Sequence, residues 1–137
     1  MRRGPVVRRG AMNLVDSSGW IEFFNDGPYA SYFLEALRDM NKVIVPTLCF
    51  YEVFSYVMKN MSDAEALQVV AFMQQSQSVD LTDAVAVLAA RLSAKHNLPF
   101  SPGITLATAQ LNHAVVWTQD PFLKDFPDVK YYPKKKD

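Results

Sequence analysis

Short apolar runs alternate along this chain with longer segments in which apolar residues recur every third or fourth position. The runs are too short for helices and several are rich in valine and isoleucine, so they predict buried strands. These strands are expected at residues 13–15, 42–45, 114–118 and 129–132, with at most a further short strand at 78–80. The longer segments predict helices with one buried face.

Helix-capping residues set the expected starts of these helices. Ser62 with Glu65 three positions later is a capping-box pattern, and Thr82 precedes the apolar positions of the next helix. Thr47 and Ser101 are expected to cap two more. The helices are expected from residue 17, at 28–40, 48–59, 63–74 and 83–96, and from residue 102. Strands that alternate with helices predict an α/β fold whose parallel sheet is covered on both faces.

The helix expected from residue 102 carries several small residues. Pro102 is well placed at its first position, where a missing backbone N–H costs nothing. Gly103, Ala107 and Ala109 follow within the next two turns. Small side chains allow close approach, so this helix is expected to pack tightly against the sheet.

The length and composition suit one domain. The chain has 137 residues, half of them hydrophobic, which is enough for a sizeable core. Residues 1–11 contain four arginines and no apolar stretch typical of a secretory signal, so they are expected to lie outside the fold as a basic leader. The domain is expected at residues 12–133, followed by a basic tail at 134–137.

Two further features concern the setting of the protein. No apolar run approaches the roughly 18 residues that span a membrane. The single cysteine, Cys49, excludes an internal disulfide and fits a reducing cytoplasm, with the side chain acting as a small buried hydrophobe.

The formal net charge of zero hides an uneven distribution. Residues 12–133 hold seven of the 14 basic residues and 13 of the 14 acidic ones, which gives this segment a formal charge of −6. Such an acidic body argues against nucleic-acid binding through a broad basic surface. Divalent cations or the lysine tail remain two ways of holding a phosphate, although the tail also suits a solvated end.

Three carboxylates are placed to meet at one edge of the predicted sheet. Asp16 directly follows the first strand and Asp120 follows the strand at 114–118, while Glu52 lies early in the helix after the second strand, among apolar and aromatic residues. Ligands of open α/β sheets bind at the carboxyl ends of the strands. Two simpler interpretations stay open: Asp16 caps the next helix, and Glu52 points to solvent.

Clustered carboxylates without histidine or cysteine suit Mg²⁺ or Mn²⁺. Such cations orient water and polarise a phosphodiester. His96 and His113 lie at expected element ends without a ligand pattern, so we interpret both as structural.

These residues resemble a known family, the PIN domains of the VapC toxin type. The segments that carry the resemblance are 15–22, 45–53, 98–109, 116–120 and 127–131, in the family's order and spacing. The resemblance implies a compact α/β fold with a parallel sheet of four or five strands. It also implies a Mg²⁺- or Mn²⁺-dependent endoribonuclease that cleaves single-stranded RNA or tRNA, a homodimer, and a cognate antitoxin that blocks the site.

The resemblance also assigns roles to residues. The family's acids match Asp16, Glu52 and Asp120, which would bind the metal and carry catalysis, and the hydroxyls of Ser18 and Thr118 match its supporting polar groups. The chain departs from the family at Pro102, where an aspartate is usual. No acid lies between residues 98 and 112 to replace it. The metal site is therefore expected to have three carboxylates instead of four and to bind its cation more weakly.

Three functions remain open at this stage. The first is a metal-dependent ribonuclease toxin. The second is a catalytically impaired PIN domain that acts by binding its antitoxin or RNA, which the proline at position 102 favours. The third is another doubly wound domain, such as a signalling receiver with Asp16 as the phosphoacceptor, although the acid pair and the lysine that receivers need are not evident.

Overall fold

The computed structural model of the chain describes residues 11–135 and contains a five-stranded parallel sheet. The strand order is β3-β2-β1-β4-β5, so the first strand lies at the centre. The strands are β1 (Met12–Val15), β2 (Val43–Pro46), β3 (Gln77–Val79), β4 (Ala114–Thr118) and β5 (Val129–Tyr131). The predicted strands are therefore confirmed to within about two residues at each end, and the predicted fold class is correct.

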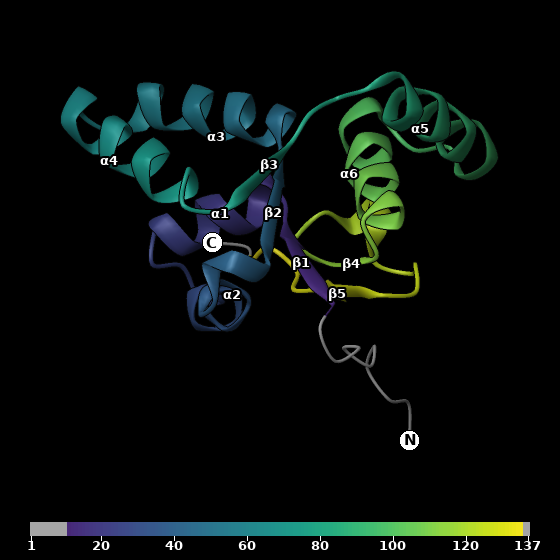
Figure 1. The fold of residues 1–137 in the computed structure, drawn as a ribbon. Helices are drawn as coiled ribbons and strands as arrows, with labels where there is room; N and C mark the ends of the chain where they lie inside the picture. Colours follow the sequence, from purple (N-terminus) through teal and green to yellow (C-terminus); the bar gives the residue numbers. More distant parts are fainter. Residues whose placement is uncertain (1–10, 136–137) are drawn as a thin grey trace.

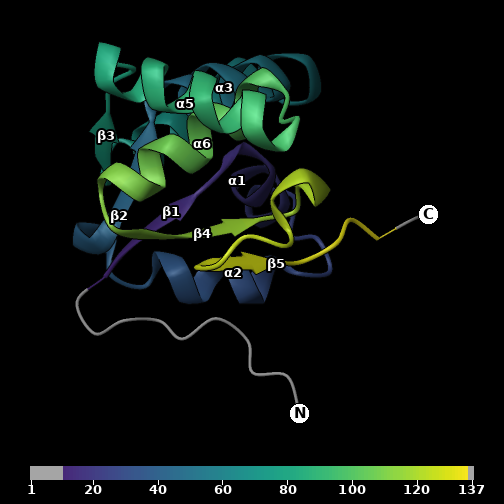
Figure 2. The same cartoon turned by 90° about the vertical axis from the view of Figure 1, so that its right-hand side faces the viewer.

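Helices cover both faces of this sheet (Figures 1 and 2). The helices are α1 (Ser17–Phe24), α2 (Ala30–Leu37), α3 (Thr47–Asn60), α4 (Asp63–Met73), α5 (Asp83–His96) and α6 (Phe100–Leu111), with short 3-10 helices η1 (Met40–Lys42) and η2 (Pro121–Leu123). Within the described residues, no helix is long and apolar enough to cross a membrane.

Alternation along the strands divides the core into two faces. Val15 and Trp117 pair across β1 and β4 and pack with residues of α1 to α4. Leu14 and Val116, one residue earlier on each strand, contact α6 on the opposite face. Successive side chains of a strand point to opposite faces, so each central strand is buried on both sides.

Two predicted helix starts are wrong, and a proline explains each. Thr47 is the first residue of α3 instead of its cap, because Pro46 occupies the N-cap position. Pro99 likewise precedes α6, which therefore begins before Pro102. Proline has no N–H to lose at a helix start, and its fixed φ suits the turn from an extended segment into a helix. The caps expected at Ser62 and Thr82 are confirmed.

The second helix is also shorter than predicted. It ends at Leu37, and Asp39 then adopts an extended backbone and caps η1 by accepting a hydrogen bond from the Asn41 N–H. This local capping ends the helical segment before residue 40.

The small residues of α6 face another helix more than the sheet. A Cβ atom on Gly103 would lie 2.3 Å from Ser93 Oγ of α5. Ala107 of α6 packs with Val85 and Ala89 of α5. Of these three small residues, only Ala109 packs with buried residues of the sheet. The expectation of tight packing is confirmed, but for two of the three small residues the partner is α5.

The expected terminal segments fall largely outside the described residues. Of the basic leader at 1–11 only Ala11 is described, and of the basic tail only Lys134 and Lys135, both exposed.

Candidate functional site

The carboxyl ends of β1 and β4 meet at the point where the strand order reverses. From β1 the chain adds β2 and β3 on one side, and β4 and β5 on the other. In Figure 2 the arrowheads of β4 and β5 point toward the side on which η2 lies. Such a switch point leaves a crevice at the strand ends, which is the usual ligand site of an open parallel sheet.

Asp16 directly follows β1 at this point and is buried, with 5% of its surface exposed. Its Oδ1 accepts hydrogen bonds from the Gly19 N–H at 3.0 Å and from Ser18 Oγ at 2.6 Å. Its Oδ2 accepts a short hydrogen bond from Thr118 Oγ1. Asp16 therefore does cap α1, and the same side chain also links that helix to β4.

Burial raises the pKa of Asp16 to about 6. Removal from water disfavours the charged carboxylate, and the nearby charge of Asp120 adds to this effect. Hydrogen bonds from Ser18, Thr118 and Gly19 favour the charged form and limit the rise. A positive charge close to the carboxylate of Asp16 would lower the pKa of this residue again.

The two hydroxyls predicted to support the site connect its strands. Ser18 Oγ accepts a hydrogen bond from the Gln119 N–H at 2.9 Å. Thr118 Oγ1 accepts one from the Asp120 N–H at 2.8 Å. Both hydroxyls also donate to Asp16, so the network fixes the backbone of residues 118–120 relative to α1.

Asp120 has a second local partner. Its Oδ1 accepts a hydrogen bond from the Phe122 N–H at 2.9 Å and so caps η2. This bond holds the carboxylate close to the end of β4, where its charge reaches Asp16.

Glu52 contributes a buried oxygen from the neighbouring helix α3. Its Oε1 is inaccessible to water and has no hydrogen-bond partner. The side chain as a whole is half-buried, so the interpretation that it points freely to solvent is wrong. Such an oxygen is costly to bury, which is typical of a ligand position.

Cys49 lies one turn before Glu52 and is buried, as expected. Burial raises the pKa of its thiol well above the ordinary value, and the charges of Asp16 and Glu52 raise it further. Cys49 is therefore a buried thiol that is disfavoured as a thiolate.

Pro102 is buried and lines the same hollow as Asp120 and Ser18. The position at which the family usually has a fourth acid thus faces the site, and here it carries an apolar ring. We call this hollow the η2 pocket; it has a volume of about 660 Å³. Its other lining residues are Pro99, Gln119, Pro121, Phe122, Tyr131, Pro133 and Lys134.

A second hollow adjoins the first, and we call it the α1 pocket. It has a volume of about 550 Å³ and shares Ser18, Gln119 and Lys134 with the η2 pocket. Its remaining lining residues are Ile21, Glu22, Asn25, Pro28, Tyr56 and Lys135. The two pockets form one groove along the acidic edge of the sheet.

The acids are not gathered into a closed metal cage. Among residues 11–135, no group of three or more His, Cys, Asp or Glu side chains is arranged to hold a metal ion. Asp16 and Asp120 lie close enough for their charges to interact, and the charges of Asp16 and Glu52 both reach Cys49.

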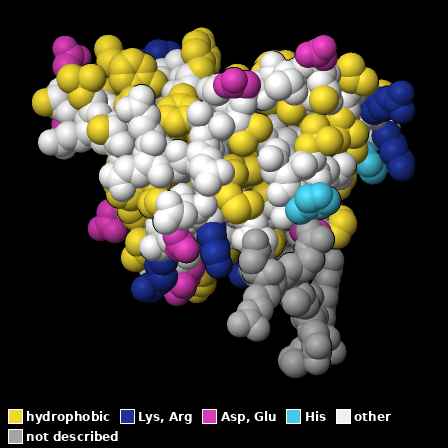
Figure 3. All heavy atoms as spheres, viewed as in Figure 1, with side chains coloured by type: hydrophobic (Ala, Val, Ile, Leu, Met, Phe, Trp, Pro, Cys, Tyr) yellow, Lys and Arg dark blue, Asp and Glu magenta, His cyan; other side chains and the backbone are white. Residues whose placement is uncertain are grey.

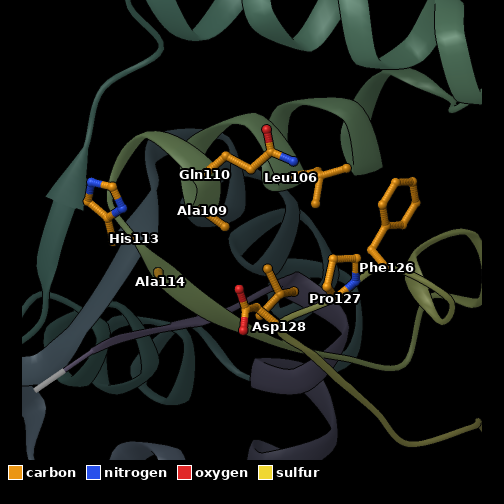
Figure 4. Close-up of a pocket in the computed structure, with 9 residues that line it drawn as sticks. Leu106, Ala109, Gln110, His113, Ala114, Phe126, Pro127 and Asp128 are labelled. Atoms are coloured by element: carbon orange, nitrogen blue, oxygen red, sulfur yellow. The ribbon is translucent and has the colours of Figure 1, made fainter. Parts of the chain in front are cut away.

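The histidines lie away from this edge. His113 lines a smaller hollow of about 170 Å³ at the amino ends of β4 and β5, together with Gln110 and Asp128 (Figure 4). His96 packs edge-on against Phe126. Both positions agree with the structural role expected for these residues.

Gln119 is a residue of the site that the sequence did not single out. It is 3% exposed, and its side-chain nitrogen is buried without a hydrogen-bond partner. Its place between Thr118 and Asp120 was the available signal, because a residue between two site residues at a strand end also reaches the crevice.

Comparisons with solved structures agree on the fold. The chain resembles a toxin-antitoxin complex from Klebsiella pneumoniae, with a TM-score of 0.77 and 20% identity over 89% of this chain and 99% of that one. It also resembles VapBC2 from Rickettsia felis bound to a promoter DNA fragment, with a TM-score of 0.70 and 14% identity over 89% and 98% of the two chains.

A third similar structure is VapC20 from Mycobacterium tuberculosis, a toxin that cleaves the sarcin-ricin loop. Its TM-score is 0.68, with 16% identity over 85% of this chain and 98% of that one. A comparison with curated proteins finds no match.

The family itself is established by the sequence. The PIN domain family matches residues 14–129, a span that runs from β1 to the start of β5 and includes all three candidate acids. The interpretation as a signalling receiver is therefore set aside. By its sequence match and its fold, this chain belongs to the PIN domain family.

Proposed function

We propose that this PIN domain is the toxin of a type II toxin-antitoxin system and hydrolyses RNA phosphodiesters with the help of Mg²⁺ or Mn²⁺. The observation that supports the proposal is the pair Asp16 and Asp120 at the switch point of the sheet, with the unpartnered Glu52 oxygen on the neighbouring helix α3. The RNA would be single-stranded or a tRNA, and the setting would be the cytoplasm.

The residues present fit a hydrated hard cation. All three candidate ligands are carboxylates, which Mg²⁺ and Mn²⁺ prefer. Mg²⁺ commonly keeps several waters and needs only one or two protein carboxylates. The absence of a three-ligand cage among residues 11–135 is therefore compatible with such an ion. The raised pKa of Asp16 and the unpartnered Glu52 oxygen both favour a positive charge here.

Asp16, Asp120 and Glu52 would hold the cation directly or through water. When bound, the cation lowers the pKa of a coordinated water and stabilises negative charge on the phosphate. Ser18 and Thr118 would act as positioning residues, because their hydroxyls fix both oxygens of Asp16. The buried position of Asp16 keeps its carboxylate oriented before any ligand arrives.

Pro102 removes one acid from this arrangement. Fewer negative ligands bind a divalent cation more weakly. We therefore expect activity only at higher cation concentration than a four-carboxylate site would need.

The proposed protein partners rest on the similarity to solved toxin-antitoxin complexes. The similar structures from Klebsiella and Rickettsia are a toxin-antitoxin complex and a VapBC complex. We infer that this chain pairs with a cognate antitoxin and forms a homodimer. On the face shown in Figure 3, lysine and arginine side chains gather at separate edges, so RNA would not be held by a broad basic surface there.

The test is cleavage of tRNA by the antitoxin-free protein in Mn²⁺. We expect cleavage by the natural chain, its loss in Asp16→Asn, and unchanged cleavage in Asp63→Asn, which removes an exposed acid from the first turn of α4. Equal cleavage by Asp16→Asn would contradict the assignment of Asp16, and absence of cleavage over the whole Mn²⁺ range would contradict the enzymatic function of this chain.

A second function is favoured by one observation. With Pro102 in place of an acid, the domain is suited to bind its antitoxin or RNA without cutting. This function would be supported if RNA binds and only a variant with a restored acid cleaves it.

A further inference from the structure

The groove along the acidic edge changes character along its length. The η2 pocket is walled mainly by prolines and two aromatic rings, those of Phe122 and Tyr131. The α1 pocket on the other side of Ser18 and Gln119 is more polar and contains Asn25 and Tyr56. Asp120 lies in the apolar part, so that pocket opens directly beside the proposed reaction site.

Phe122 is the most exposed aromatic ring of this pocket. It directly follows Pro121 in η2 and is 53% exposed, although an aromatic side chain of this size usually buries more of its surface. Its backbone N–H is held by Asp120, so the ring belongs to a fixed turn. An exposed ring on a fixed support, next to a pocket of about 660 Å³, is suited to stacking against a flat ligand.

Positive charge borders the same pocket. Lys134 lines both halves of the groove, and Lys135 lines the α1 half. These two lysines are the cationic residues in the lining of the groove, which also includes the acids Glu22 and Asp120. The buried side-chain nitrogen of Gln119 also lacks an acceptor at the junction of the two halves.

We propose that the η2 pocket is a nucleobase subsite, in which one base of a single-stranded RNA stacks on Phe122 while Lys134 holds the adjoining backbone phosphate. The inference rests on the proposed function and adds to it the manner in which the substrate is held. The apolar wall beside a basic rim matches the alternation of base and phosphate along a strand. A base paired in a duplex could not enter the pocket, so the subsite selects unpaired segments.

The test measures binding separately from cleavage. Fluorescence polarisation with fluorescein-labelled hexauridylate, in Ca²⁺ and with the RNA checked afterwards for integrity, gives a dissociation constant for each variant. Phe122→Ala is expected to weaken binding about 5- to 150-fold, the range for loss of one stacked base. Phe122→Trp should retain binding, and Phe100→Ala, which removes a 65% exposed ring that lines neither pocket, should not change it.

A second ligand distinguishes a base from other contacts. An abasic ribose-phosphate hexamer should bind the natural chain more weakly than hexauridylate, and Phe122→Ala should not weaken it further. Equal loss for both ligands would assign Phe122 to the backbone and overturn the inference.

Two other results would overturn the nucleobase subsite. Neither would decide the proposed function, which the cleavage assay tests separately. One is hexauridylate binding that Phe122→Ala does not change, and the other is no hexauridylate binding by the natural chain. If Phe122→Ala instead weakened only capture of the antitoxin, the pocket would be a protein-binding site. Conversely, base-dependent binding without any cleavage would uphold the subsite and contradict the enzyme.

Discussion

The hydroxyl of Thr118 donates a hydrogen bond to the buried carboxylate of Asp16, across 102 residues of sequence. This bond joins the carboxyl ends of β1 and β4, and the same hydroxyl accepts the Asp120 N–H. One threonine thus positions one candidate acid directly and a second through the backbone. The relative positions of Asp16 and Asp120 depend on this hydrogen bond. Several substitutions can test that dependence.

Thr118→Val should remove the bond while keeping the side-chain shape. We expect a loss of about 1.5–3 kcal/mol of unfolding free energy, the range for a hydrogen bond to a charged group. The loss should be larger at pH 8 than at pH 5, because removal of this donor raises the pKa of Asp16 further. Urea denaturation of both proteins at pH 5 and pH 8 measures this loss of unfolding free energy. The matched control is Thr108→Val, whose hydroxyl donates to the Ile104 carbonyl within α6 and whose effect should not depend on pH.

Asp16→Asn should stabilise the protein at neutral pH. The folded pKa of about 6 lies above the ordinary value of 3.8. Between these two pH values the folded state therefore keeps a proton that the unfolded state has lost. The contribution of Asp16 to stability therefore falls as the pH rises from about 4 to 6 and stays low above that. A shift of this size corresponds to about 3 kcal/mol.

The measurement for Asp16→Asn is denaturation in EDTA at pH 4 to 8. The stability advantage of the variant over the natural chain should be small at pH 4 and reach its full size by pH 7. An advantage that does not vary with pH would contradict the raised pKa. Asp63→Asn, which changes an exposed acid, serves as the control.

Gly19→Ala should loosen the junction between α1 and α2. The added Cβ would lie 2.7 Å from the Phe33 ring and 2.8 Å from Val15 Cγ1, both fully buried. We expect a loss of about 1–3 kcal/mol from overpacking. A double-mutant cycle with Phe33→Leu, followed by thermal denaturation, checks the cause. The smaller side chain should relieve the clash, so the double variant should lose less stability than the two single variants lose together.

Pro102→Asp should restore a fourth acid to the site. The residue lies in the first turn of α6, where a negative charge also favours the helix dipole. We expect Mn²⁺ to bind about tenfold more tightly, as measured by isothermal titration calorimetry. Pro99→Asp is the matched control, since it adds an acid to the same pocket at a different position. An equal gain in both variants would point to general charge instead of a specific ligand.

Lys134→Ala should reduce the salt dependence of RNA binding. Each phosphate contact to a single strand contributes about 0.7 to the slope of log K against log salt concentration. Removal of this lysine should lower the slope by about that amount. Lys59→Ala, at the exposed end of α3, should leave the slope unchanged. An unchanged slope for Lys134→Ala would remove the lysine from the proposed groove.

Much of the fold followed from local patterns in the sequence. Short apolar runs predicted β1, β2 and β4, because a strand buried on both faces leaves a continuous apolar segment. The edge strand β3 has the polar sequence Gln77–Val79, and the sequence indicated at most a short strand there. Asp16 and Asp120 could be brought together because both follow parallel strands. The strand order was not accessible, since it depends on which strands pack side by side and no local pattern records that.

The errors share a physical origin. Gly103 and Ala107 pack against α5, a partner that the pattern of α6 alone does not reveal. Phe122 and Gln119 lie in a turn and at a strand end, where no periodicity marks a side chain as buried or exposed. Pro46 and Pro99 displaced the expected caps because sequence rules place proline inside the first turn more readily than before it.

The central place of β1 also governs when the protein becomes complete during synthesis. Met12–Val15 can pair with β2 soon after both are made, but the partner on its other side, β4, follows about a hundred residues later. Until Thr118 has left the ribosome, Asp16 lacks its hydrogen-bond donor from β4, and the crevice is bounded on one side only. The candidate site is therefore incomplete until nearly the whole domain has been translated, because β4 is paired with β1 but follows it by most of the chain.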